Sequence, residues 1–233
     1  MPVEVCSYRL SLRGKPVGTH VLKTEGLGRH TQLEGRASFQ GSLGAATITQ
    51  RSRCHSQRHF SLRFREEIQE RSEQRSFDVS FDAQRGLVTA AKGQRDVATA
   101  PYLRSYRDPL SLLFEIRSLG ASESTHVPML GKDVHVQLAG EVELETAMGL
   151  RRAWAYLLHP GQSVVYVDIE APHLMLKLSQ RLAEGQLEAL LVKVGSEASL
   201  DAFEAEPVQP PERGAKAAKR RARRRRPRRG RRD

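Results

Sequence analysis

The sequence predicts a mainly β protein: a large curved antiparallel sheet, or an open or half-closed β-barrel, with one short buried helix and a disordered basic tail. Apolar and polar residues alternate with a period of two over most of residues 1–195, as half-buried strands require. Turn-forming residues separate these runs at intervals that suit hairpins, and nothing alternates strand with helix as a parallel sheet would.

The N-terminal half contains the clearest hairpins. Residues 3–26 form two strand-like runs around a turn at Gly14-Lys15-Pro16, and residues 30–53 repeat this design around the GSLG turn at 41–44. Two further runs alternate strictly, so each is expected to place its large apolar side chains on one face: Phe60, Leu62 and Phe64, then Phe77, Val79 and Phe81.

One segment, residues 106–120, has helical spacing instead. Asp108 stands where an N-cap is expected and Pro109 occupies the first helical position. Apolar residues then continue almost without interruption, and Gly120 is the expected stop. The segment therefore predicts one short helix that is apolar nearly all round and buried.

Strands resume after the helix. Residues 133–149 alternate again, and two hairpins follow, turning at Pro160-Gly161-Gln162 and near residues 183–186. About eleven strands joined by consecutive hairpins predict an up-and-down meander.

Charge divides the chain into three expected parts: a β domain at 1–195, an acidic and then Pro-rich linker at 196–212, and a disordered Arg-rich tail at 213–233. Residues 212–233 hold 13 of the 38 Lys and Arg residues but two of the 27 acidic ones, so the remainder has 25 of each sign. The formal charge of +11 therefore belongs to the tail. A flexible arginine block suits phosphate groups, since guanidinium is always charged and binds them in a bidentate manner.

We expect the tail to bind DNA or RNA through phosphates and without sequence preference, because no aromatic residue follows Phe203 to stack on bases. An anionic membrane or other polyanion, or no specific partner, remain the alternatives. The candidate nucleic-acid-binding residues are Lys219, Arg220, Arg221, Arg223, Arg224, Arg225, Arg226, Arg228, Arg229, Arg231 and Arg232.

Three stretches share their order and spacing with a known family. They are a tyrosine-led first strand reaching a G-x-x-x-G turn, a D-x-L-S helix ending in arginine, and a late hairpin pair; the matching residues are Tyr8, Gly14, Gly18, Asp108, Leu110, Ser111 and Arg117. Over about residues 3–195 the chain resembles the bacterial domain-of-unknown-function family 3108. The resemblance implies an open or half-closed β-barrel with a helix on its concave side, similar to lipoprotein-carrier folds, and it implies no activity.

A carrier or sensor of an apolar ligand or lipid is the second hypothesis, with the tail acting only as a localiser to anionic surfaces. An open barrel can hold an apolar molecule, unless these side chains simply form a filled core. The candidate cavity residues are Phe60, Phe64, Leu113, Phe114, Trp154, Leu174 and Leu176.

A second basic feature lies in the body. Alternation in residues 51–65 gives either a basic stripe or an ordinary solvated face, neutralised by Glu66, Glu67, Glu70 and Glu73; the ordinary face is favoured. The residues that would form the stripe are Arg51, Arg53, His55, His59, Arg63 and Arg65.

Catalytic and metal motifs are not evident. No metal or cofactor is predicted, because Cys54 and His55 are adjacent and point to opposite faces of a strand. The remaining histidines are scattered along the sequence: His20, His30, His126, His135, His159 and His173. G-x-S-x-G, HExxH and P-loop patterns are absent, and Glu141, Glu143 and Glu145 share an exposed strand face, so we expect a non-enzymatic protein.

The expected location is cytoplasmic, with a nucleoid or RNA association. Cys6 and Cys54 do not form a CxxC pair and are expected to be reduced thiols. The first 15 residues have no apolar leader segment, although members of the resembling family are typically exported, and no stretch is apolar over a membrane-spanning length. The oligomeric state is not specified by the sequence.

Overall fold

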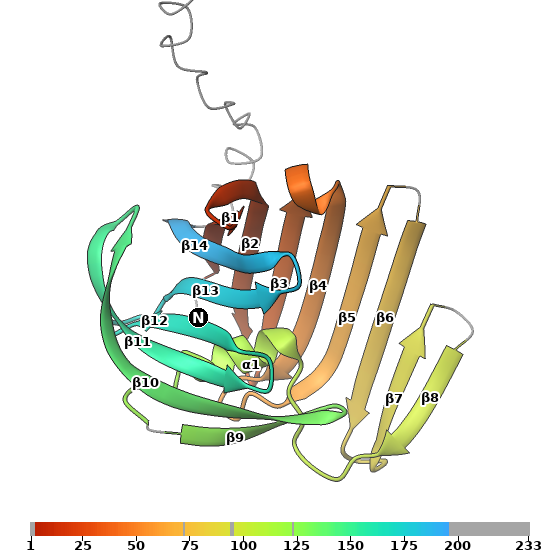
Figure 1. Cartoon of the computed structure of the whole chain (residues 1–233). Helices are drawn as coiled ribbons and strands as arrows, with labels where there is room; N and C mark the ends of the chain where they lie inside the picture. Colours follow the sequence, from red (N-terminus) through yellow and green to blue (C-terminus); the bar gives the residue numbers. More distant parts are fainter. Residues whose placement is uncertain (1–2, 72, 94–95, 123, 196–233) are drawn as a thin grey trace, which may run out of the picture. The chain divides into compact units, whose positions relative to one another are not determined.

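A computed structural model describes residues 3–71, 73–93, 96–122 and 124–195, all within the first of two units into which the chain divides, Met1–Ala198. These residues form fourteen strands, one α-helix and one short 3-10 helix (Figure 1). The elements are β1 (Glu4–Leu12), β2 (Lys15–Leu27), β3 (His30–Phe39), η1 (Gly41–Leu43), β4 (Ala46–His55), β5 (Ser61–Glu70), β6 (Glu73–Asp82), β7 (Leu87–Lys92), β8 (Asp96–Pro101), α1 (Pro109–Ile116), β9 (Ser124–Met129), β10 (Lys132–Thr146), β11 (Gly149–His159), β12 (Ser163–Asp168), β13 (Met175–Leu182) and β14 (Gly185–Gly195).

All fourteen strands belong to one antiparallel sheet. Its order is β8-β7-β6-β5-β4-β3-β2-β1-β14-β13-β12-β11-β10-β9, so β8 and β9 are the edge strands and the sheet does not close. Each hairpin pairs sequence neighbours, and the one long-range pairing joins β1 to β14. The predicted fold class, a large curved antiparallel sheet with one short helix, is confirmed.

The count of about eleven strands was too low, because two short edge elements lack the alternation that identifies a strand. Every residue of β8 is exposed, and Pro101 ends it. β9 contains Pro128 and buries only Val127 and Met129. An edge strand is half-paired and partly solvated, so its sequence carries little of the period-two pattern.

The expected single face of Phe60, Leu62 and Phe64 is also corrected. A register irregularity pairs Cys54 with Ser61 and Arg53 with Arg63, which leaves Leu62 without a partner on β4. The bulge turns Ser61 inward, where it is fully buried, and leaves Leu62 half-buried. A polar side chain therefore enters the interior beneath α1.

Helix α1 lies inside the curve of the sheet, between the wall formed by β1–β8 and the strands β9–β14 that fold over in front of it (Figure 1). Its Leu112 and Ile116 belong to one core cluster, with side chains of β1, β2 and β9–β14. Its Leu110 belongs to a second cluster, formed with β3–β7 and Tyr106. The helix thus joins two cores that the open sheet keeps apart.

Asp108 caps the helix as the sequence predicts, but the helix ends earlier than Gly120. Its last residue is Ile116, and Arg117 is the C-cap. Further turn hydrogen bonds, from Ser118 to Glu115 and from Leu119 to Ile116, carry the chain to Gly120, where φ is 61°. Gly120 therefore ends the turns that follow the helix and not the helix itself.

Candidate functional site

A buried polar cluster fixes the start of α1. One oxygen of Asp108, Oδ2, accepts hydrogen bonds from Ser52 at 2.6 Å and Ser61 at 2.5 Å. The other oxygen accepts the backbone N–H groups of Leu110 and Ser111, at 2.9 and 3.0 Å. The Ser111 hydroxyl accepts the Asp108 N–H in return, which completes a capping box.

The cluster is structural in its chemistry. Ser61 and Ser111 are fully buried, so neither hydroxyl can reach a substrate. Among the residues that the structure describes, no buried side-chain nitrogen or oxygen lacks a partner. The arrangement therefore anchors the start of the helix.

Two arginines secure the flanks of the helix. Arg107 forms an ion pair with Glu115, with Nε 2.5 Å from Oε2, and donates to the carbonyl of Arg58 at 2.8 Å. Arg117 forms a bidentate pair with Glu4 on β1, at 2.6 and 3.1 Å. Burial acts to lower the pKa of Arg117, but the hydrogen bonds and charge of Glu4 outweigh it and raise that pKa.

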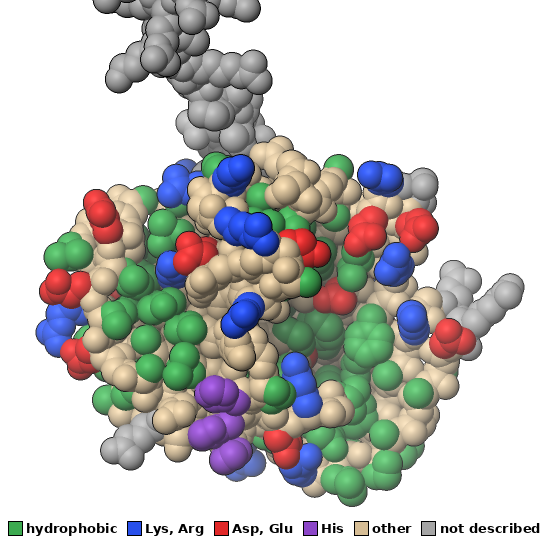
Figure 2. All heavy atoms as spheres, in the orientation of Figure 1, with side chains coloured by type: hydrophobic (Ala, Val, Ile, Leu, Met, Phe, Trp, Pro, Cys, Tyr) green, Lys and Arg blue, Asp and Glu red, His purple; other side chains and the backbone are tan. Residues whose placement is uncertain are grey.

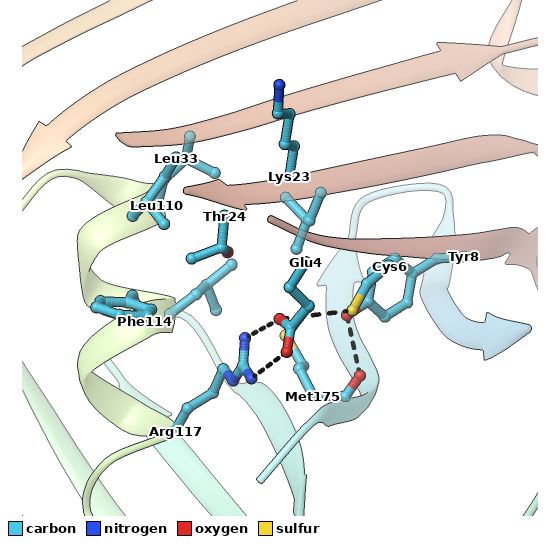
Figure 3. A pocket seen from close by; sticks show the side chains of 12 residues that line it. Glu4, Cys6, Tyr8, Lys23, Thr24, Leu33, Leu110, Phe114, Arg117 and Met175 are labelled. Carbon is cyan, nitrogen blue, oxygen red and sulfur yellow. Dashed lines mark hydrogen bonds and ion pairs between the residues drawn. The ribbon is translucent and has the colours of Figure 1, made fainter. Parts of the chain in front are cut away.

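A small pocket lies beside this second pair, between α1 and strands β1–β3 (Figure 3). Its volume is about 30 Å³, which holds one or two water molecules and is far below the volume of a drug-sized ligand site, about 300 Å³ or more. The lining residues are Glu4, Cys6, Tyr8, Leu22, Lys23, Thr24, Leu33, Leu110, Leu113, Phe114, Arg117 and Met175.

The titratable groups of the pocket wall are held in their neutral or paired forms. Burial, and then the charge of Glu4, raises the pKa of the Cys6 thiol to about 12. Burial raises the pKa of Tyr8 well above its ordinary value, and its hydroxyl donates to the Met175 carbonyl at 3.0 Å. A thiol with this pKa is protonated at neutral pH, so Cys6 is not an activated nucleophile.

The structure places the seven predicted cavity residues in several different surroundings. Leu113 and Phe114 line the pocket beside α1. Phe64, Leu174 and Leu176 are core residues of the two clusters. The ring centroid of Phe60 lies 5.1 Å from that of His55, and half-buried Trp154 lies 5.5 Å from His173.

The predicted basic stripe brings four arginines together on the outer face of β4 and β5. Arg51 lies directly opposite Arg65, and Arg53 lies opposite Arg63. Ion pairs join three of them to carboxylates: Arg51 to Glu34 at 3.0 Å, Arg63 to Asp78 at 2.7 Å, and Arg65 to Glu67 at 2.6 Å. Arg53 lies 3.1 Å from the His30 ring.

The prediction of which acidic residues neutralise these arginines was only partly right. Glu67 does so, whereas Glu66 bonds Gln50 and both Glu70 and Glu73 pair with Arg75. Glu67 shares a face with Arg65 because the two are two residues apart on one strand. The other two partners, Glu34 and Asp78, lie on neighbouring strands, and strand pairing alone identifies them.

The two histidines of the predicted stripe, His55 and His59, make contacts of their own. His55 accepts the backbone N–H groups of Gln57 and Arg58, and the His59 ring packs edge-on against Phe114, with centroids 5.0 Å apart. Cys54 is buried, and burial raises the pKa of its thiol to about 12.

Some of the sequence predictions concern residues outside the part of the chain that the structure describes. The eleven candidate nucleic-acid-binding residues of 219–232 and the proposed linker lie outside the described residues. Within the described ranges, no three His, Cys, Asp or Glu side chains converge on a metal position. No helix there has both the length and the apolar character that crossing a bilayer requires.

Comparison with known protein families gives one match. The family described as protein of unknown function (DUF3108) matches residues 7–192, which is most of the chain. The chain belongs to this family. Three residues of the motif on which the family resemblance rested have a structural role. Asp108 and Ser111 cap α1, and Arg117 forms an ion pair that links the helix to β1.

Among solved structures, the DUF3108 domain is similar to a β-barrel-like protein of domain of unknown function DUF1849 from Brucella abortus. The TM-score is 0.56 at 10% sequence identity, and the match covers 83% of this chain and 97% of the other. At this identity the likeness concerns the fold alone. No curated protein matches the chain.

Proposed function

We propose that the protein binds nucleic acid through its Arg-rich C-terminal segment, by phosphate contacts that do not depend on sequence. The observation that carries the proposal is the composition of residues 212–233, which hold 13 basic residues and two acidic ones. Arginine outnumbers lysine there by eleven to two, which suits bidentate phosphate contacts. In this proposal the protein is not an enzyme, and its cytoplasmic location follows from its partner.

The folded domain supports this division of labour. Three of the four clustered arginines on β4 and β5 are already paired with carboxylates, and residues 1–211 carry equal numbers of acidic and basic residues. A charge-balanced surface offers little counterion release on binding a polyanion. The folded domain would then act as a scaffold or partner-binding module, and the basic segment would make the contacts with nucleic acid.

The test is a binding titration with a mixed-sequence oligonucleotide. Affinity of the full chain should fall about a thousandfold or more between low and physiological salt if several phosphates are contacted. Deletion of residues 213–233 should abolish binding. As a matched control, Arg51→Gln removes one arginine from the outer face of the sheet and should change affinity less than about twofold, because Glu34 already neutralises it. Equal binding by the truncated protein would overturn the proposal.

The alternative is a carrier or sensor of an apolar ligand or lipid. The pocket beside α1 has a volume of about 30 Å³, so a ligand of that kind that bound there would have to displace the helix. Displacement must break the Asp108 cluster and both arginine pairs. Native mass spectrometry of the purified protein distinguishes the two: a co-purified lipid supports a carrier, and nucleic acid lost on truncation supports the leading proposal.

A further inference from the structure

Three histidines that are far apart in the sequence form one row across three adjacent strands. His135 on β10 pairs directly with His126 on β9 and with His159 on β11. Val134 and Val136 flank His135 and are buried in the core, so the His135 ring lies on the opposite, outer face. Histidine side chains gather in one column on the molecular surface (Figure 2).

The rings lie close enough to share a ligand. The centroids of His126 and His135 are 4.6 Å apart with planes 15° from parallel, and those of His135 and His159 are 6.2 Å apart at 31°. His126 and His159 are exposed and His135 is half-buried. All three rings are therefore open to an ion from solvent.

We propose that this row is a binding site for a borderline divalent transition metal, such as Zn²⁺, Ni²⁺ or Cu²⁺. His126 and His135 would be the two protein ligands, and solvent would complete the coordination. Neutral imidazole is a favoured ligand of these metals. In a tetrahedral site two ring nitrogens about 2.0–2.1 Å from the metal lie about 3.4 Å apart.

Small changes in geometry reach this arrangement. The two rings are nearly parallel with centroids 4.6 Å apart, so they must tilt toward each other before one nitrogen of each can point at a shared ion. Rotation about the side-chain torsions of the exposed His126 provides that movement. The strands need not move, because directly opposite residues already have Cβ atoms about 5 Å apart. The described residues contain no preformed group of three ligands, which agrees with a site built from two imidazoles and water.

His159 has a different place in the row. Its ring is farther from His135 and more tilted, so it is a second partner that His135 can use only after a larger movement. Magnesium and calcium prefer oxygen ligands and are not expected to bind. The proposal does not depend on the Arg-rich segment, since all three histidines lie on the folded sheet.

Calorimetric titration of the untagged, metal-stripped full chain tests the proposal. Ni²⁺ and Zn²⁺ should each bind at one equivalent, and Mg²⁺ should not. His135→Gln and His126→Gln should each weaken Ni²⁺ binding by about tenfold or more, because each removes a direct ligand. His159→Gln should weaken binding by less than about threefold, because the pair His126–His135 remains.

His173→Gln is the matched control. His173 is a half-buried histidine between β12 and β13, whose Nδ1 lies 3.1 Å from the Asp168 carbonyl oxygen, and its loss should leave metal binding unchanged. The urea midpoint of each variant shows whether it is folded, and the two ligand variants test the site independently of each other. Absence of saturable binding at millimolar Ni²⁺ overturns the site, as does wild-type affinity in both ligand variants. A larger loss in His159→Gln than in His126→Gln overturns the choice of ligand pair.

Discussion

Replacing Asp108 with alanine should destabilise the fold more than any surface substitution, because one carboxylate serves four donors. Asp108→Ala removes the N-cap of α1, which costs about 1 kcal/mol. It also leaves the buried hydroxyl of Ser52 without its acceptor, at about 1–2 kcal/mol, and leaves buried Ser61 with only the Ser111 hydroxyl 2.9 Å away, at about 1 kcal/mol. The free energy of unfolding should therefore fall by about 3–4 kcal/mol, which corresponds to a Tm lower by roughly 10 °C for a domain of this size.

Urea unfolding followed by tryptophan fluorescence measures this loss. Trp154 is the single tryptophan of the chain and lies half-buried on β11, against the core cluster that contains Leu112 and Ile116 of α1. The matched control is Asp133→Ala, which removes an exposed ion pair with Arg104 and should cost less than about 1 kcal/mol.

A double-mutant cycle separates the buried cluster from the cap. Ser52→Ala should lower the free energy of unfolding by about 1 kcal/mol in the native protein. In the Asp108→Ala background it should leave the free energy of unfolding unchanged or raise it. The reasoning fails if Asp108→Ala stays within about 0.5 kcal/mol of the native protein, or if Ser52 and Asp108 prove energetically independent.

The remaining predictions concern ionisation, thiols and backbone geometry. Burial lowers the pKa of His20 to about 4, so between pH 6.5 and 4 the unfolded chain binds a proton that the folded chain does not. The free energy of unfolding should therefore fall by up to about 3 kcal/mol as the pH drops from 6.5 to 4. His20→Gln should flatten this pH dependence in urea titrations. Cys6 and Cys54 should not react with a thiol reagent at neutral pH until urea unfolds the domain, because burial raises both pKa values to about 12; rapid labelling of the native protein would contradict this. Gly18→Ala should prevent stable folding, since its Cβ would lie 2.0 Å from a carbonyl oxygen of β3. Gly14→Ala, at φ 74° and with no neighbouring atoms, should cost only about 1 kcal/mol. Melting curves followed by circular dichroism compare the two variants, and equal melting temperatures would be inconsistent with the clash.

The local architecture was predictable because it depends on short-range patterns. Alternation identified most strands, and turn residues identified most hairpins. Asp108 and Pro109 marked the start of the helix, since a cap and a fixed φ act within one turn. The bulge at Leu62 and the exposed edge strand β8 were missed, because neither leaves a regular pattern in the sequence.

The candidate sites were less predictable. The amino-acid sequence alone shows that residues 1–211 are balanced in charge and that the basic excess lies in the last 22 residues, since charge is a sum over composition. Which acids neutralise Arg51, Arg63 and Arg65 depended on strand pairing.

Which distant residues meet depends on the tertiary structure. The pairing of β1 with β14 joins the first eight strands and the last six into one open sheet, and the packing of α1 brings Arg117 to Glu4 across 113 positions of sequence. The three histidines of β9, β10 and β11 look scattered along the chain, yet register places them in one row. A slip of one residue in either pairing would turn a ring to the other face, so this row is a property of register, which turns and bulges set.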